Sequence, residues 1–343
     1  MFVDEMVADR SSSSTTILDQ IRDLARPLAS GHYVADWDRR SMEIGRLSDS
    51  YSLLAKENGH WTNATETSAV RPLSLTASRA IGGDTLAEQA RLSMNFDFAL
   101  LTGEDYRIVG KAAARLDSAE KIVISAAAYA LCHLDNPPEL TLELMNLLYE
   151  EALHLDAIGR LLGIDHATRP WIPEDRQGNW DLVRGCTSPL DYMVIEHCLY
   201  EGRGTIASAA GAWQLERAGV SPAAVAVMDA IALQEANHNV SGFRWLRLLD
   251  RGRPEDDAAL ARVVRRFLEV EPVPAADGSD ASRKKHFPFF LIQVYRDTGD
   301  FPLLKDHIVT ASRNARRTGD AGVDPDELYR RSAEALAWCK AAA

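Results

Sequence analysis

The chain has 343 residues, of which 46% are hydrophobic and 26% charged, and it carries a net charge of −12. This composition is typical of a globular protein, and since no run of about 18 apolar residues occurs, it predicts no membrane-spanning helix. The acidic N-terminus lacks the apolar core of a signal peptide, so we expect a cytoplasmic protein. The excess of negative charge disfavours nucleic acid as a partner, because a phosphate backbone requires a basic surface.

The N-terminal third gives few structural signals. Residues 1–16 are polar and rich in Ser and Thr, which predicts disorder. Isoleucine and leucine at helical spacing predict a helix over residues 17–26, with Pro27 at its end. Residues 31–85 mix short apolar pieces with Gly, Asn and Pro, which indicates loops or short helices.

From about Asp105 the sequence becomes alanine-rich and strongly helical, and this first long helix ends at the tetrapeptide DNPP. Proline fits the first turn of a helix, so Pro137 and Pro138 are predicted to begin the second helix, with Asn136 as its N-cap. The second helix is expected to end at Gly163, a residue type that favours helix C-termini.

A connection of about 25 residues, 164–188, follows, and its length indicates a crossover or a functional loop. Ser-Pro dipeptides then begin the third and fourth helices, at Ser188 and Ser221, and these helices end near Arg217 and Asp250. Four long helices with two short turns and one long connection predict a ferritin-like four-helix bundle of two hairpins joined by a crossover.

The predicted domains are therefore an N-terminal extension, partly irregular, over residues 1–104, the bundle over 105–250, and a C-terminal helical extension over 251–343 that packs on the bundle. The C-terminal extension contains a helix near 256–271, a loose linker, a mixed segment and a last helix from about Pro325. The basic run SRKKH in the mixed segment is interpreted as a solvated loop. Four cysteines without a Cys-x-x-Cys pair are predicted to be reduced thiols.

Glu-x-x-His occurs on both the second and the fourth predicted helix, as Glu151 with His154 and as Glu235 with His238. Residues three apart share a helix face, so each motif presents a carboxylate and an imidazole one turn apart. A third copy, ENGH beginning at Glu57, contains a glycine and lies outside any helical pattern. We interpret that copy as chance.

Position within the hairpins connects the two motifs. Residues equidistant from the turn of an antiparallel helix pair lie at the same height, and Glu120 mirrors Glu151 in this way, as Glu201 mirrors Glu235. At about 1.5 Å rise per residue, all these groups lie roughly 20 Å from their turns. Glu196 is a rival to Glu201, but five residues along an α-helix it points about 140° away, and hairpin symmetry favours Glu201.

Packing the two hairpins together would gather four carboxylates and two imidazoles at one level, which is the ligand set of di-iron and di-manganese bundles. Carboxylates among apolar neighbours are costly to bury unless a cation neutralises them. The predicted metal ligands are Glu120, Glu151, His154, Glu201, Glu235 and His238.

This pattern resembles the ferritin-like di-iron carboxylate superfamily, over residues 105–250, and within it the oxygen-activating enzymes more than the storage ferritins. The sequence YEGRG around Glu201 is similar to that of the tRNA-hydroxylating MiaE enzymes. The resemblance implies two carboxylate-bridged iron ions, O2 as co-substrate and an external electron donor. General metal affinities do not select iron over manganese, so manganese stays open.

The resemblance also implies residues that support the ligands. In such enzymes the residue before the motif glutamate often bonds the ligand histidine of the opposite helix, and Glu150 and Gln234 hold these positions here. Gln234 departs from the usual acidic residue. Arylamine N-oxygenases carry a further histidine where this chain has Ile231. His197 and Tyr200, near the third-helix glutamate, are candidates for the same supporting layer, with a packed histidine and a core aromatic as the alternatives.

Three functions lead among those compatible with these features, and a helical binding protein without metal is a more distant alternative. The favoured one is a non-haem di-iron oxygenase of a small-molecule substrate, in secondary-metabolite tailoring by N-oxygenation (such as hydrazine to azoxy) or hydroxylation, because the added segments can cover the bundle and shape a pocket. The alternatives are a MiaE-like tRNA hydroxylase, which the net charge opposes, and a ferroxidase or di-manganese protein without an organic substrate. The expected partners are the substrate and a redox protein, without a membrane, and a homodimer is compatible with the sequence.

Overall fold

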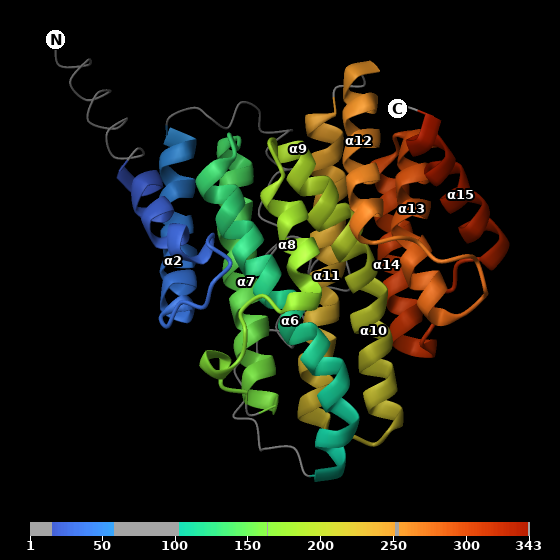
Figure 1. Cartoon of the computed structure of the whole chain (residues 1–343), viewed down its shortest axis with the longest axis horizontal. Coiled ribbons are helices and arrows are strands. Elements are labelled where there is room, and N and C mark those ends of the chain that lie inside the picture. Colours follow the sequence, from blue (N-terminus) through green and yellow to red (C-terminus); the bar gives the residue numbers. More distant parts are fainter. Residues whose placement is uncertain (1–15, 58–102, 163, 251–253, 342–343) are drawn as a thin grey trace. The chain divides into compact units, whose positions relative to one another are not determined.

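All regular structure that the computed structural model describes is helical (Figure 1), and no strand occurs in the described ranges. This confirms the all-α prediction. In the same ranges, no helix combines the length and the apolar character needed to cross a membrane. The described residues are 16–57, 103–162, 164–250 and 254–341.

Three of the sequence predictions fall outside the described residues. They concern the disorder of residues 1–15, the irregular region 58–85 with His60 of the third Glu-x-x-His, and the helix stop at Gly163.

The chain divides into two compact units. The first takes its described residues from Met1–Thr76 and Arg115–Trp180, and the second takes them from Ala77–Ala114 and Asp181–Ala343. Each unit thus contains one of the two Glu-x-x-His motifs. The predicted domain boundaries at residues 104 and 250, and the four-helix bundle topology, stay predictions.

Three long helices and one shorter helix form most of the first unit. Helix α2 packs along α7, and Gly45 permits a close approach, since a Cβ atom there would lie 2.9 Å from the ring of Tyr149. The predicted N-terminal helix is present and extends slightly past Pro27. The helices are 16–28, α2 (Trp37–Glu57), the part of α6 (Gly103–His133) from Arg115 onward, and α7 (Pro138–Leu162).

Helix α2 corrects the prediction of loops or short helices at its position. Its buried residues follow helical spacing, but two of them are serine, which weakens the hydrophobic period. Both serine hydroxyls donate to backbone carbonyls of the same helix, Ser41 to Trp37 at 2.8 Å and Ser48 to Gly45 at 2.6 Å. Burial of these hydroxyls therefore leaves no donor unsatisfied. The buried positions are Trp37, Ser41, Ile44, Ser48 and Tyr51.

The turn between α6 and α7 differs from the prediction in its cap. Helix α7 begins at Pro138, but the Asn136 side chain does not cap it. The Asn136 amide instead donates to the carbonyls of Ala130 at 2.7 Å and Leu134 at 3.3 Å, at the end of α6. Asn136 thus satisfies the last carbonyls of the preceding helix rather than the first amides of the next.

The connection after α7 is more ordered than a plain loop. The Trp171 indole is buried and donates from Nε1 to the Ser125 hydroxyl at 2.8 Å, which fixes the connection on α6. Trp180 is also buried, with its ring edge-on to Tyr129. The helices of this connection are η1 (His166–Thr168), η2 (Glu174–Arg176) and α8 (Gln177–Arg184).

The predicted third and fourth helices have the expected ends, but the third is not a regular α-helix. It consists of α9 (Pro189–Tyr192), a π-helical segment (Met193–Tyr200) and α10 (Glu201–Arg217). The Ser188 hydroxyl caps it by accepting from the Asp191 amide at 3.1 Å. Helix α11 (Pro222–Leu249) packs along α10, and Ser221 precedes it without a side-chain capping bond.

The C-terminal region contains four helices where two were predicted. They are α12 (Pro254–Val270), α13 (Asp280–Thr298), α14 (Phe301–Thr318) and α15 (Pro325–Ala341). The first and last agree with the predictions, whereas the mixed segment is in fact α13 and α14. The SRKKH run lies within α13, and its Ser282 and His286 are buried, so the interpretation as a solvated loop was wrong.

A proline inside α13 explains why this helix was missed. Pro288 removes one backbone donor from the helix interior, which normally predicts a break. The proline ring packs on α10 at Gly202, where a Cβ atom would lie 3.1 Å from Pro288 Cγ. Packing against the neighbouring helix therefore outweighs the local preference of the sequence.

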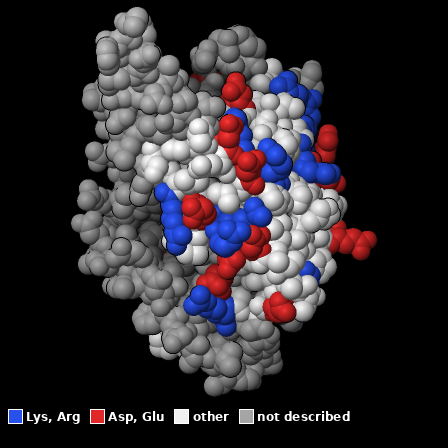
Figure 2. Space-filling model, turned by 90° about the vertical axis from the view of Figure 1, so that its left-hand side faces the viewer, with Lys and Arg blue, Asp and Glu red and all other residues white. Residues whose placement is uncertain are grey.

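Acidic and basic side chains are interspersed on the face of the molecule in Figure 2. Such pairs occur at helical spacing in the N-terminal helices, for example Arg22 with Asp19 at 3.9 Å and Arg40 with Asp36 at 2.8 Å. Pairs of this kind contribute only about 0.3–0.5 kcal/mol each, so their main effect is a hydrated surface.

Phe290→Ala in α13 should destabilise the second unit by about 3–5 kcal/mol, because the removed ring is fully buried and leaves a cavity. Urea unfolding followed by circular dichroism measures the loss. Leu303→Ala in α14 is the control, since this side chain is exposed, and it should cost less than about 0.5 kcal/mol. Equal losses for the two variants would contradict the placement of Phe290 in the core.

Candidate metal centre

The first cluster consists of Glu120, Glu151 and His154, which all belong to the first unit. One ligand atom of each lies within 4.8 Å of the other two. His154 Nδ1 is 3.0 Å from Glu151 Oε2 on the same face of α7, and 3.6 Å from Glu120 Oε2 on α6. All three residues are buried, with at most 1% exposure. The structure thus brings Glu120 to the height of the motif, as the spacing about the turn predicts.

Burial and mutual repulsion control the protonation of this cluster. Burial and the Glu151 carboxylate raise the pKa of Glu120 well above its ordinary value. Burial alone would lower the pKa of His154, but the carboxylates of Glu151 and Glu120 raise it well above the ordinary value. Without a bound cation, Glu120 and His154 therefore retain protons to higher pH than they would in water.

Another buried carboxylate on α6, Asp117, gives the contrasting case. Burial raises its pKa, but close contacts with His166 and Lys121 outweigh burial and lower the pKa below the ordinary value. Lys121 Nζ lies 2.9 Å and His166 Nδ1 lies 3.2 Å from the Asp117 carboxylate. At Asp117, one carboxylate is paired with both an ammonium and an imidazole. The first cluster instead places two carboxylates around one imidazole.

The second cluster consists of Glu201, Glu235 and His238, which all belong to the second unit and are at most 5% exposed. His238 Nδ1 lies 3.8 Å from Glu201 Oε1. The two carboxylates converge beside Gly204, where a Cβ atom would lie 2.6 Å from Glu235 Oε2 and 3.2 Å from Glu201 Oε2. The glycine therefore makes room for both carboxylates on the facing sides of α10 and α11.

Backbone contacts hold α10 and α11 together at this cluster. The Thr205 hydroxyl donates to the carbonyl of Glu201 at 2.8 Å and lies 3.4 Å from the carbonyl of Glu235. One buried side chain thus contacts the backbone of both glutamate-bearing turns. This contact fixes the relative height of the two glutamates.

Among the described residues, Glu201 belongs to a group of buried Glu and His and Glu196 does not, but the predicted reason for this difference does not apply. Glu196 is buried on the π-helical segment, and the Glu201 amide bonds its carbonyl, so the two residues are one π-turn apart. The α-helical angle of about 140° therefore does not apply. What separates them is height along the helix, and among the described residues Glu196 belongs to neither cluster.

The predicted supporting residues lie at different distances from the clusters. His197 Nδ1 is 3.3 Å from the carbonyl of His238, so this histidine contacts the backbone of the turn that carries His238. The Tyr200 ring packs edge-on against Phe267 of α12, with 4.9 Å between ring centroids. Glu150 and Gln234 are half-buried next to their motif glutamates. Their supporting roles stay predictions.

Two residues that contact the second cluster were missed in the sequence. Gly204 follows Glu201 by three positions, so the spacing indicates that both share one helix face, and this signal was available. Thr205 gives no such signal, because a threonine inside a helix most often bonds its own backbone.

The cysteines confirm the prediction of four free thiols and belong to neither cluster. Burial raises the pKa of Cys132 to about 11 and that of Cys339 to about 12. Burial also raises the pKa of Cys186 and of Cys198. All four thiols therefore stay protonated near neutral pH, which makes them poor metal ligands.

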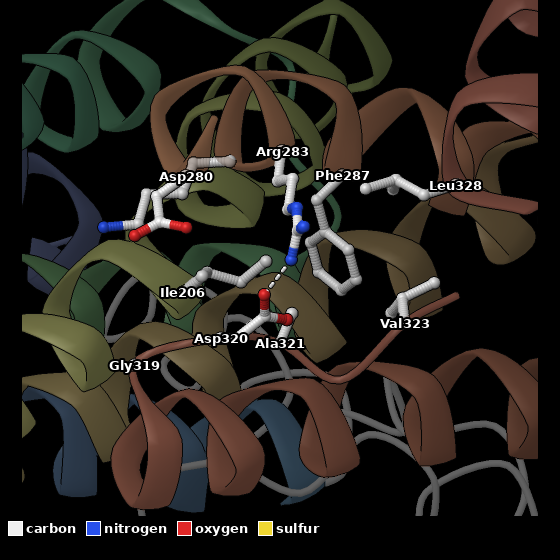
Figure 3. A pocket seen from close by; sticks show the side chains of 10 residues that line it. Ile206, Asp280, Arg283, Phe287, Gly319, Asp320, Ala321, Val323 and Leu328 are labelled. Carbon is white, nitrogen blue, oxygen red and sulfur yellow. Dashed lines mark hydrogen bonds and ion pairs between the residues drawn. The ribbon is translucent and has the colours of Figure 1, made fainter. Parts of the chain in front are cut away.

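A hollow elsewhere in the second unit is shown in Figure 3. It lies between α10, α13 and the segment joining α14 to α15, with a volume of about 320 Å³ including its open mouth. Arg283 forms an ion pair with Asp320 across it, and burial lowers the pKa of Lys284 at its edge. The hollow shares no residue with the second cluster, so it is separate from the candidate metal centre.

The described residues define an all-α protein with buried clusters of Glu and His that could hold metal ions. No known family model, curated protein or solved structure matches this chain. The assignment of a function therefore rests on the chemistry of these residues.

Glu120→Gln should make the metal-free protein more stable than wild type at neutral pH, because a buried glutamine is neutral without a proton. The pKa of Glu120 is raised in the folded state, so the unfolded chain loses its proton first as pH rises past the ordinary value of 4.5. Wild-type stability therefore falls from that pH up to the folded-state pKa.

The measurement is the Tm of both proteins with a chelator at a series of pH values. The gap between variant and wild type should be small near pH 4.5 and should widen as pH rises. Glu334→Gln, at an exposed position on α15, should show no such widening. A Tm difference independent of pH would argue against a raised pKa of the Glu120 carboxyl.

Proposed function

We propose that the two clusters bind two metal ions, and that with iron the protein is a non-haem oxygenase of a small-molecule substrate. The observation that carries the proposal is the matched composition of the clusters. Each joins a helical Glu-x-x-His to one glutamate of an adjacent helix, and every member is buried. This is the ligand set of helical di-iron and di-manganese carboxylate proteins.

The residues present fit such a metal pair. Glu120 Oε1 is buried and takes part in no hydrogen bond within the described residues, so a ligand position on this carboxylate is open. The bare backbone at Gly204 leaves space where the carboxylates of Glu201 and Glu235 converge. Carboxylate oxygen and imidazole nitrogen are donors that iron and manganese both accept.

In this proposal the chain supplies charge, orientation and exclusion of water. A pair of iron ions, when bound, supplies the electrons that activate O2. Four glutamates balance the charge of the ions, and His154 and His238 contribute nitrogen ligands. His154 and Glu120 must give up the protons that the metal-free cluster retains, so binding releases protons.

The apolar surroundings support a reactive site rather than simple storage. Leu155 and Ile158 on α7 and Ile231 on α11 are fully buried next to the motifs, which keeps water from the clusters. Ile231 stands where arylamine N-oxygenases carry an additional histidine, so any N-oxygenation here would use six protein ligands. Helices α12 to α15 add covering structure that a bare four-helix core lacks.

Metal content tests the ligand assignment. Wild-type protein should bind about two iron or manganese ions per chain, following the ligand count of such bundles. Glu151→Ala and His238→Ala should each lower the content, with helical circular dichroism retained. Glu139→Ala, on α7 outside both clusters, and Glu57→Ala, in the third Glu-x-x-His, are matched controls that should keep two ions. The opposite pattern, with loss in the controls and retention in the cluster variants, would end the assignment.

Oxygen consumption separates an oxygenase from a ferroxidase. Iron-loaded protein with a chemical reductant should consume O2 in proportion to an added amine, hydrazine or hydroxylatable substrate, with oxygen from O2 appearing in the product. An oxygen electrode and mass spectrometry with labelled O2 measure both. Oxidation of iron alone, unaffected by any organic compound, would instead favour iron oxidation as the activity.

A further inference from the structure

The π-helical segment before Glu201 shifts one backbone hydrogen bond. The Glu201 amide donates to the carbonyl of Glu196, five residues earlier. In an α-helix the same amide would donate to the carbonyl of His197, four residues earlier. In the π register, the His197 carbonyl therefore does not accept from the Glu201 amide, as it would in an α-helix.

Asn239 donates a hydrogen bond to this carbonyl. Its Nδ2 amide lies 2.7 Å from the carbonyl of His197 and 3.3 Å from the carbonyl of Cys198. The side chain is 0% exposed and follows His238 directly in α11. A return contact runs from His197 Nδ1 to the carbonyl of His238 at 3.3 Å. The turn of α11 that carries His238 is thus hydrogen-bonded to the π-helical segment that precedes Glu201.

Two glycines allow this contact. At Gly242 a Cβ atom would lie 2.6 Å from His197 Cβ and 2.8 Å from its carbonyl carbon, so only glycine lets α11 approach the segment this closely. At Gly202 a Cβ atom would lie 3.3 Å from Asn239 Nδ2. The close approach brings the amide of Asn239 within hydrogen-bonding distance of the backbone.

We infer that Asn239 is a positioning residue that holds the π register and thereby directs Glu201 towards Glu235 and His238. Without the amide, the π register loses this buried hydrogen bond to the His197 carbonyl, whereas the α register provides the same carbonyl with the Glu201 amide. The segment would then relax to α, and a shift of one residue turns Glu201 by about 100°. This inference rests on the proposed metal site, and π-segments are frequent at functional sites.

Metal titration of the purified full-length protein tests the inference, with Co2+ as the probe. Asn239→Ala should weaken binding by about 10–100-fold, the usual effect of losing a residue that orients a ligand. Asn237→Ala is the matched control, since it removes the same buried amide two residues away, outside the π-segment contacts, and should bind as wild type does. Circular dichroism and Tm establish that both variants are folded.

Coupling to Glu201 distinguishes positioning from a general loss of structure. Glu201→Gln should weaken Co2+ binding by itself, and the double variant with Asn239→Ala should be no weaker than Glu201→Gln alone. The ligand-field absorption of bound Co2+ should be the same in both single variants. Effects that multiply, or wild-type binding by Asn239→Ala, would overturn the role of Asn239.

Failure of the proposed metal site gives a different result. If Glu201→Gln binds Co2+ as wild type does, Glu201 is not a ligand, and the metal site and the positioning role both fail. If Asn239→Ala does not fold, Gly242→Ala takes its place, because its Cβ atom must displace the His197 backbone. That variant should also weaken Co2+ binding without adding to the effect of Glu201→Gln, and wild-type binding would count against the inference.

Discussion

Burial of carboxylates beyond the available cationic partners is the constraint on which the rest of this structure depends. Each unit places two glutamates and one histidine among apolar helix faces. Asp117 shows how the same helix satisfies a carboxylate when no metal is needed, with Lys121 at 2.9 Å and His166 at 3.2 Å. In the first cluster, burial and the neighbouring Glu151 carboxylate instead raise the pKa of Glu120, so its charge is less well compensated than that of Asp117. A bound cation is the most direct means of supplying that compensation.

The two clusters reach similar compositions by different backbone arrangements. In the first, regular α-helices suffice, because Glu151 and His154 share a face of α7 and Glu120 lies at the same height on α6. In the second, the helix with Glu201 contains a π-helical segment, and glycine permits unusually close contacts. The arrangement of the second cluster therefore depends on residues outside it, whose contacts determine where Glu201 and Glu235 lie.

Hydrophobic periodicity and helix caps predicted the four long helices and grouped the glutamates and histidines within each hairpin. They could not predict α2, because Ser41 and Ser48 occupy core positions and satisfy their hydroxyls locally. They could not predict α13 either, because Pro288 opposes a helix that tertiary packing at Gly202 maintains. In both cases the signal in the sequence was local, whereas the deciding interaction involved the helix backbone or a distant helix.

The choice between Glu196 and Glu201 shows the same limit at the site itself. Regular α-helical geometry separates these residues by direction, but the π register separates them mainly by height. A sequence pattern contains no direct record of that register, since one amide–carbonyl pairing replaces another without changing which residues are apolar. The residues that contact the π-helical segment are instead Asn239 and Gly242, more than forty positions along the chain from the carbonyls that they contact. Spacing can therefore indicate which glutamates and histidines come together, whereas their orientation depends on the residues that hold the backbone.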